Sequence, residues 1–162
     1  RGVWAPAEHI ALARQTLDRE RAEPSHARRL EAGRARRAAV QSSYASEFEV
    51  AVQHFLAFAP IHDELAVRLA RAIASHSVPV GSGTVARTRR IPIEARAEAA
   101  TIAWLRHATT AYDTMSIPRV KGMRREVRRM LAERSRDLLR RYRRGECVSA
   151  ERCPLEQGLS PG

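Results

Sequence analysis

Basic residues crowd the stretch at residues 117–144, which carries the strongest chemical signal in the sequence. It holds twelve basic and three acidic residues, so its local charge is +9 within a chain of formal net charge +11. Guanidinium groups make forked hydrogen bonds to phosphate oxygens, and a dense cationic surface releases counterions from a polyanion. Nucleic acid, RNA slightly ahead of DNA, is therefore the predicted partner. The basic residues are Arg119, Lys121, Arg124, Arg125, Arg128, Arg129, Arg134, Arg136, Arg140, Arg141, Arg143 and Arg144.

Arginine is also favoured by the composition of the whole chain. Lys121 is the only lysine and asparagine is absent, a pattern typical of a GC-rich genome. The choice of arginine over lysine is thus weak support for bidentate recognition of phosphate or guanine. The net charge is unaffected, because a replacement of lysine by arginine keeps the positive charge. Docking of the basic face on an acidic protein stays open as an alternative.

Residues just upstream of the basic stretch could do acid–base chemistry. His107 and Asp113 are six residues apart, with Tyr112 beside Asp113, and they could form an acid/base pair or bind a metal. A structural histidine with a helix-capping aspartate explains the same residues, and we favour that interpretation. A Mg²⁺-dependent enzyme acting on nucleic acid would need more carboxylates than this region offers. We therefore assign no catalytic residue, metal or cofactor, and keep such an enzyme as the alternative.

A glycine-rich loop at residues 79–90 is a second candidate for phosphate binding. Gly81 and Gly83 permit unusual backbone conformations, and the loop leads into a helix expected to start near Pro92. Backbone N–H groups of such a loop can cradle a phosphate. The P-loop pattern G-x4-G-K-[ST] is missing, so a plain connection between helices explains the loop slightly better.

The loop, the turn at residues 112–113 and the basic helix are predicted to share one surface. The loop opens the helix that ends at His107, and the turn then leads almost directly to Lys121. An extended stripe suited to a nucleic-acid backbone is the expected site. Its predicted contacts are Arg87, Arg89, Arg90, Lys121, Arg125, Arg128, Arg129, Arg136, Arg140 and Arg143, supported by Ser82, Thr84, His107, Tyr112 and Asp113.

Helical periodicity runs through nearly the whole chain, so an all-α fold is predicted. Residues 1–45 are expected to form a helical arm with little to bury, followed by a compact basic domain at residues 46–144 and a flexible tail at residues 145–162. Ser46 and Glu49 have the spacing of a capping box that would start the domain. Pro60 would then separate two short helices of an antiparallel hairpin.

The helix that displays the basic residues is expected at residues 122–142. Plotted at about 100° per residue, its apolar side collects Met123, Val127, Met130, Leu131, Leu138 and Tyr142. Its opposite side collects Arg125, Arg128, Arg129, Arg136, Arg140 and Arg143. Arg134 falls on the apolar side, where it would need a buried carboxylate from Asp113 or Glu98.

Several motifs occur in an order that resembles a known family. They are residues 80–88 (VGSGTVART), residues 103–107 (AWLRH), residues 110–113 (TAYD), residues 120–122 (VKG) and the arginine-rich helix. Together they resemble the family catalogued as domain of unknown function 2293, found in bacteria and fungi, over about residues 48–143. The resemblance implies a domain and no established activity, cofactor or catalytic residue. Residues 2–6 also resemble an interior stretch of longer bacterial members, and the chain starts with Arg1, so we expect an upstream portion.

Hydropathy and cysteine usage predict a cytoplasmic protein with no membrane partner. No apolar run approaches the ~20 residues that span a bilayer, and no secretory signal is recognisable. Cys147 and Cys153 follow a C-x5-C spacing with no further cysteine and no nearby histidine. We therefore assign them neither a zinc site nor a disulfide.

Overall fold

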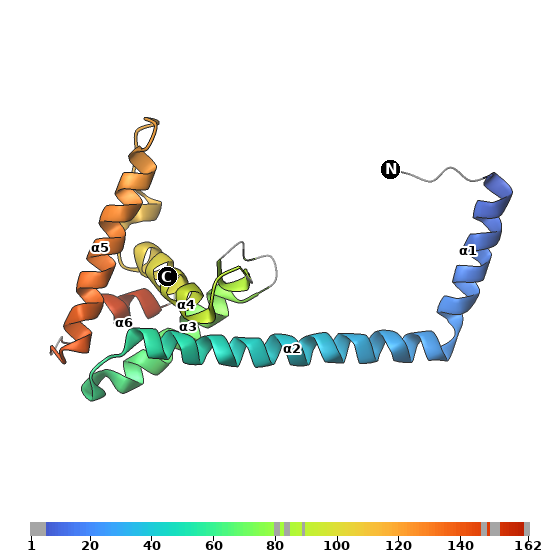
Figure 1. The fold of residues 1–162 in the computed structure, drawn as a ribbon, viewed down its shortest axis with the longest axis horizontal. Helices are drawn as coiled ribbons and strands as arrows, with labels where there is room; N and C mark the ends of the chain where they lie inside the picture. The colour runs from blue at the N-terminus through green and yellow to red at the C-terminus, as the bar shows by residue number, and fades with distance from the viewer. Residues whose placement is uncertain are drawn as a thin grey trace. The chain divides into compact units, whose positions relative to one another are not determined.

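The computed structural model describes residues 6–79, 82, 85–88, 90–146, 149 and 153–160. Every regular element within these residues is helical and none is a strand, so the predicted all-α fold is confirmed (Figure 1). Contacts divide the chain into two units, residues 1–43 and residues 44–162. The elements are α1 (Ala7–Ala22), α2 (Pro24–Leu56), η1 (Pro60–His62), α3 (Asp63–Ser77), η2 (Val85–Arg87), α4 (Ile93–Ala108), η3 (Ala111–Asp113), α5 (Met123–Arg143) and α6 (Pro154–Leu159).

The first unit consists of α1 and the first half of α2. None of its described residues is buried, and Leu12 is 65% exposed. Alanine and arginine dominate these helices, so the scattered apolar side chains form no continuous face that could pack.

Helix α2 runs without a break from residue 24 to residue 56, so the predicted helix start at Ser46 is wrong. The residues before Ser46 are rich in alanine and arginine, which favour helix, and the backbone continues through the local capping signal. The last turns of α2 then enter the core of the second unit through Phe48, Val52 and Leu56.

The core of the second unit contains many small side chains, but it forms one continuous cluster. Besides the end of α2, it takes Leu65, Leu69 and Ile73 from α3, and Ala97, Ala100 and Leu105 from α4. The alanines of α4 leave room for neighbouring helices to approach closely. Helix α4 is consequently the central element, in contact with α3, α5 and α6.

Helices α4 and α5 pack antiparallel (Figure 1). Near the start of α5, Arg128 Nε donates to Tyr112 Oη, just beyond the end of α4, at 2.8 Å. Two turns later Arg136 reaches Glu98, near the start of α4, at 3.4 Å. The two contacts fix the relative direction of the helices.

The buried side of α5 differs from the one predicted. Its bounds agree closely with the expected residues 122–142, and the predicted burial of Leu131 and Tyr142 is confirmed, but the other buried residues are Ser135 and Leu139. Met130, which was expected to pack, is 49% exposed. Two apolar stripes are present in this sequence, and helical periodicity alone did not show which one meets α4.

A glycine ends α5. Gly145 has a positive φ of 70°, its N–H donates to Tyr142 O, and the N–H of Glu146 donates to Arg141 O. This is the Schellman arrangement, which favours glycine at the left-handed position. A Cβ at Gly145 would lie 3.3 Å from the Cβ of Ala59, so the turn also packs tightly against the chain after α2.

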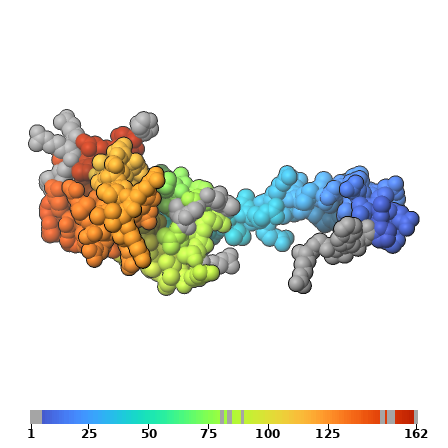
Figure 2. Space-filling model, turned by 90° about the horizontal axis from the view of Figure 1, so that it is seen from above, coloured from blue at the N-terminus to red at the C-terminus, as the bar shows by residue number. Residues whose placement is uncertain are grey.

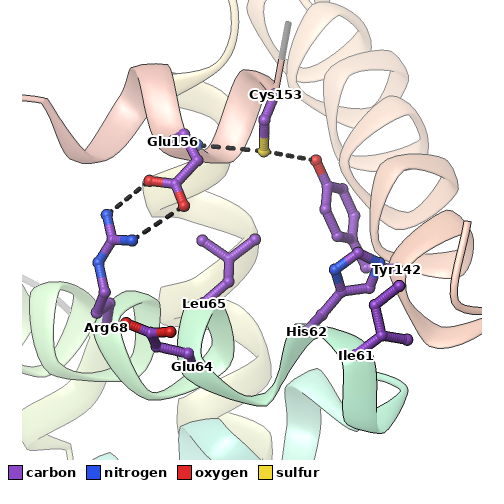
Figure 3. Close-up of a pocket in the computed structure, with 8 residues that line it drawn as sticks. All are labelled: Ile61, His62, Glu64, Leu65, Arg68, Tyr142, Cys153 and Glu156. Atoms are coloured by element: carbon purple, nitrogen blue, oxygen red, sulfur yellow. Dashed lines mark hydrogen bonds and ion pairs between the residues drawn. The ribbon is translucent and has the colours of Figure 1, made fainter. Parts of the chain in front are cut away.

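The predicted flexible tail is wrong for residues 153–160, which form α6 and pack on the core. Leu155 is fully buried and Cys153 nearly so. Cys153 Sγ lies 2.8 Å from Tyr142 Oη and accepts the N–H of Glu156, while Arg68 donates two hydrogen bonds to the Glu156 carboxylate at 2.9 and 2.6 Å (Figure 3). Burial, followed by the contact with Cys153, raises the pKa of the Tyr142 phenol.

Candidate nucleic-acid interface

The arginines of the basic stretch fall into two groups that differ in their partners. Those in the second half of α5 are held by acidic or carbonyl oxygens, with Arg134 as the exception among the described residues. Arg136 contacts Glu133 at 2.8 Å and Glu98 at 3.4 Å, and Arg140 pairs with Asp137. Glu146 accepts from Arg141 at 2.8 Å and from Arg144 at 2.5 Å. Arg136 and Arg140, both predicted phosphate contacts, are therefore partly neutralised.

Arg143 was predicted to contact phosphate, and the structure gives it another role. Its guanidinium donates to the backbone oxygens of Leu56, at 2.9 Å, and Phe55, and lies 5.2 Å from the centre of the Phe55 ring. These oxygens belong to the last turn of α2, where carbonyls lack helical partners and a cation is favourable. Arg143 therefore caps α2 and ties α5 to it.

The first half of the basic stretch has few partners. Within the described residues, Arg119, Lys121, Arg124, Arg125 and Arg129 form no ion pair and no side-chain hydrogen bond, and all are exposed. Figure 2 shows α5, in orange, open to solvent on the face in view. Arg128 contacts only the neutral Tyr112 phenol. We call Arg119, Lys121, Arg124, Arg125, Arg128 and Arg129 the cationic cluster.

A hollow opens beside the cationic cluster. Its volume is about 650 Å³, and its lining consists of Pro118, Arg119, Val120, Gly122, Arg124, Arg125 and Arg128. None of these lining residues is acidic, so the hollow is electropositive and unneutralised by the protein.

Three of the residues predicted to support the site, His107, Tyr112 and Asp113, meet one another. His107 Nδ1 lies 2.6 Å from Asp113 Oδ1, and the rings of His107 and Tyr112 meet edge to face with centres 5.1 Å apart. The Arg106 guanidinium covers the Tyr112 ring at 4.9 Å. Because Arg128 donates to the phenol of Tyr112, this group continues into the cationic cluster.

The His107 and Asp113 pair could orient a general base, although its exposure fits a structural role as well. The side chains are 46% and 61% exposed. Arg106 Nη2 lies 3.4 Å from His107 Nε2, so a neutral imidazole would accept there and donate from Nδ1 to Asp113. No cluster of three metal-ligating side chains occurs among the described residues.

Arg106 is the residue that sequence reasoning missed. It stacks on Tyr112, contacts His107, and has a buried Nε without a partner in the structure. The available signal was weak, because an arginine beside a histidine in an arginine-rich chain is unremarkable in sequence.

The described residues of the glycine-rich loop lie away from this group. Ser82 Oγ donates to Ser77 O at 2.8 Å, and Arg87 Nη1 donates to Val78 O at 2.9 Å, so both side chains bind carbonyls at the end of α3. Arg90 is exposed. Thr84 and Arg89, the other predicted contacts in this loop, lie outside the described residues.

The described residues of the loop and the group around His107 lie at opposite ends of α4, and their union in one extended stripe stays a prediction. Arg96, in the first turn of α4, holds η2 by donating to Ala86 O at 3.2 Å and to Tyr44 Oη at 2.7 Å, whereas His107 lies in its last turn. Arg96 and His107 are therefore separated by roughly 17 Å along the axis of α4.

Arg134 also differs from its prediction. Its side chain is exposed, at the edge of a hollow lined by Leu131, Leu138 and Met115. The carboxylates proposed as its partners are used elsewhere, by His107 and by Arg136. The rotation of α5 explains the difference, since the buried side passes through Ser135.

Comparisons with known proteins support the resemblance drawn from the motifs. None of the described helices is both long and apolar enough to cross a membrane. No curated protein and no solved structure matches the chain. Residues 57–143 match the model of the family described as "Uncharacterized conserved protein (DUF2293)". Since this match spans more than half of the 162 residues, the chain belongs to the DUF2293 family.

Proposed function

We propose that the protein binds nucleic acid through the cationic cluster at the start of α5. The observation that carries the proposal is the unequal pairing of the arginines along one helix. Arg134 apart, those in the second half of α5 have protein partners, whereas those of the cluster pair with no acidic residue and four of them line an electropositive hollow. Concentrated unpaired cations of this kind are a typical phosphate-binding surface.

Binding is expected to depend on phosphate contacts more than on base sequence. The cluster offers charge, and the ring of Tyr112, which contacts Arg128, is already covered by Arg106. Stacking on aromatic rings is the usual route to single-strand base contacts, so this surface favours the backbone. RNA slightly ahead of DNA remains our expectation.

Two charge-matched triple variants test the proposal. R124Q/R125Q/R129Q removes three cations of the cluster, and R136Q/R140Q/R141Q removes three paired cations from the same helix. Affinity for RNA and DNA oligonucleotides is measured over a salt series. Each lost phosphate contact lowers the slope of log K against log salt by about 0.7 to 0.9, so the first variant should lose about 2 to 3 units of slope.

The control variant should keep a slope within about one unit of the parent protein. Equal losses in the two variants would contradict the assignment to the start of α5. A flat salt response of the parent protein, or binding only to acidic proteins, would contradict nucleic-acid binding itself.

The second candidate is a nuclease that uses His107 as a base. The 2.6 Å contact between His107 and Asp113, next to Arg106 and Arg128, is the observation in its favour. Incubating labelled RNA with the parent protein and with the His107→Ala variant distinguishes a nuclease from a protein that only binds nucleic acid. Cleavage that is lost in the variant, while binding is retained, would support the enzyme.

A further inference from the structure

Arg124 and Arg128 occupy helical positions that continue the buried side of α5. The buried residues follow one another at spacings of four, four and three residues from Leu131 onward. Arg128 precedes Leu131 by three residues, and Arg124 precedes Arg128 by four. Both arginines thus point in the direction of the core, beyond the place where the core ends.

The hollow of about 650 Å³ lies on this side of the helix. One wall is the first two turns of α5, with Arg124, Arg125 and Arg128, and the other is the incoming chain with Pro118 to Val120. The walls meet at Gly122, whose φ of 89° turns the chain into the helix. Figure 1 shows this reversal at the N-terminal end of α5. Gly122 thus lies where the two walls of the hollow meet.

The positive charge that lines the hollow favours the binding of a compact anion. Four guanidinium groups line it without an acidic residue, and their mutual repulsion is relieved when an anion binds among them. Arg128 is also held in place, since its Nε donates to Tyr112 Oη at 2.8 Å. A pre-positioned guanidinium loses less side-chain freedom when it binds phosphate.

We propose that the hollow binds the terminal phosphate of a nucleic-acid strand. A phosphate monoester carries a charge of about −1.5 to −2 at pH 7, whereas each internal phosphodiester carries one negative charge. Four guanidinium groups with no acidic residue in the lining therefore favour the more highly charged end of a strand over an internal phosphate. This inference rests on the proposed function and specifies which part of the nucleic acid enters the cluster.

The test compares one oligonucleotide in three forms: with a 5′ phosphate, with a 3′ phosphate, and with hydroxyls at both ends. The protein is expected to bind one of the phosphorylated forms about tenfold more tightly than the hydroxyl form, the size of effect expected of one added charge-assisted contact. A nucleoside monophosphate serves as a fourth ligand and should bind far more weakly, because it lacks the strand that contacts the rest of the cluster.

Two charge-matched double variants locate the effect. R124Q/R128Q changes the hollow and should bring the ratio of affinities close to one. K121Q/R129Q removes the same charge from cluster residues that do not line the hollow, so it should weaken all the oligonucleotides and preserve the ratio. All four side chains are exposed, and thermal melting verifies that both variants fold.

Equal, salt-dependent binding of the three oligonucleotides by the parent protein would overturn the inference and leave the proposed function standing. If R124Q/R128Q kept the preference of the parent protein for the phosphorylated oligonucleotide over the hydroxyl form, the inference would be overturned as well. Equally tight binding of the nucleoside monophosphate would identify a small nucleotide as the ligand instead of a strand end. Absence of any binding would overturn the proposed function together with the inference.

Discussion

Leu155→Ala tests whether α6 is a structural part of the second unit. The Leu155 side chain is fully buried in the same core as Phe48 and Leu69. Its removal should leave a cavity that the surrounding helices fill only in part. Leu→Ala changes at such sites cost about 2 to 5 kcal/mol of unfolding free energy.

The corresponding shift in melting temperature follows from the size of the unit. The second unit has roughly 120 residues, and an unfolding entropy of about 2.1 cal/mol/K per residue gives a total near ~250 cal/mol/K. One kcal/mol then corresponds to about 4 °C. Leu155→Ala should lower the melting temperature by about 8 to 20 °C.

The assay is thermal unfolding followed by circular dichroism at 222 nm. Leu12→Ala is the matched control, because it deletes the same atoms from a side chain that is 65% exposed, and it should shift the transition by less than about 2 °C. If Leu155→Ala melted like this control, the docking of α6 on the core would be refuted.

Three further changes address the end of α5. Gly145→Ala forces a side chain onto a backbone with φ of 70° and places its Cβ 3.3 Å from Ala59. This change should destabilise the second unit by about 1 to 2 kcal/mol in urea unfolding. An unchanged midpoint of the urea transition would contradict the tight turn. The raised pKa of Tyr142 means that the folded state favours the protonated phenol, so stability should fall as pH rises above about 10, and Tyr142→Phe should flatten that fall. The pKa of Glu146 is lowered, first by its hydrogen bonds with two arginines, so the contribution of Glu146 to stability is present above its ordinary pKa of 4.5 and is lost as the solution becomes more acidic. Glu146→Gln should remove this acid dependence from melting curves recorded at several pH values. An identical pH profile in that variant would speak against the pairing.

The helices and their type could be predicted from the sequence because they depend on local patterns. The bounds of α5 follow from Gly122 at one end and from an arginine-rich run without proline or glycine. The meeting of His107, Tyr112 and Asp113 was also accessible, since a short turn joins them after α4. These features need only neighbouring residues, whose influence dominates helix starts, helix ends and tight turns.

The features that escaped prediction depend on residues distant in sequence. Met130 and Leu139 lie on different apolar stripes of α5, and only the packing of α4 determines which stripe is buried. Arg143 looked like another surface cation, because the free carbonyls it caps belong to Leu56. Leu155 and Leu159 in an otherwise polar tail gave too short a periodic signal, so the burial of Leu155 could not be foreseen.

The position of α6 has a consequence for the synthesis of the protein. Domains generally begin to fold as the chain emerges from the ribosome, with the earlier residues first. The core joins Phe48, near the start of the second unit, to Leu155, near its end, so the nascent chain keeps an apolar opening between α3 and α4 until residues 153–160 have emerged. A message that stops before Cys153 would thus yield a product with exposed apolar surface, which chaperones and proteases would distinguish from a chain that includes α6.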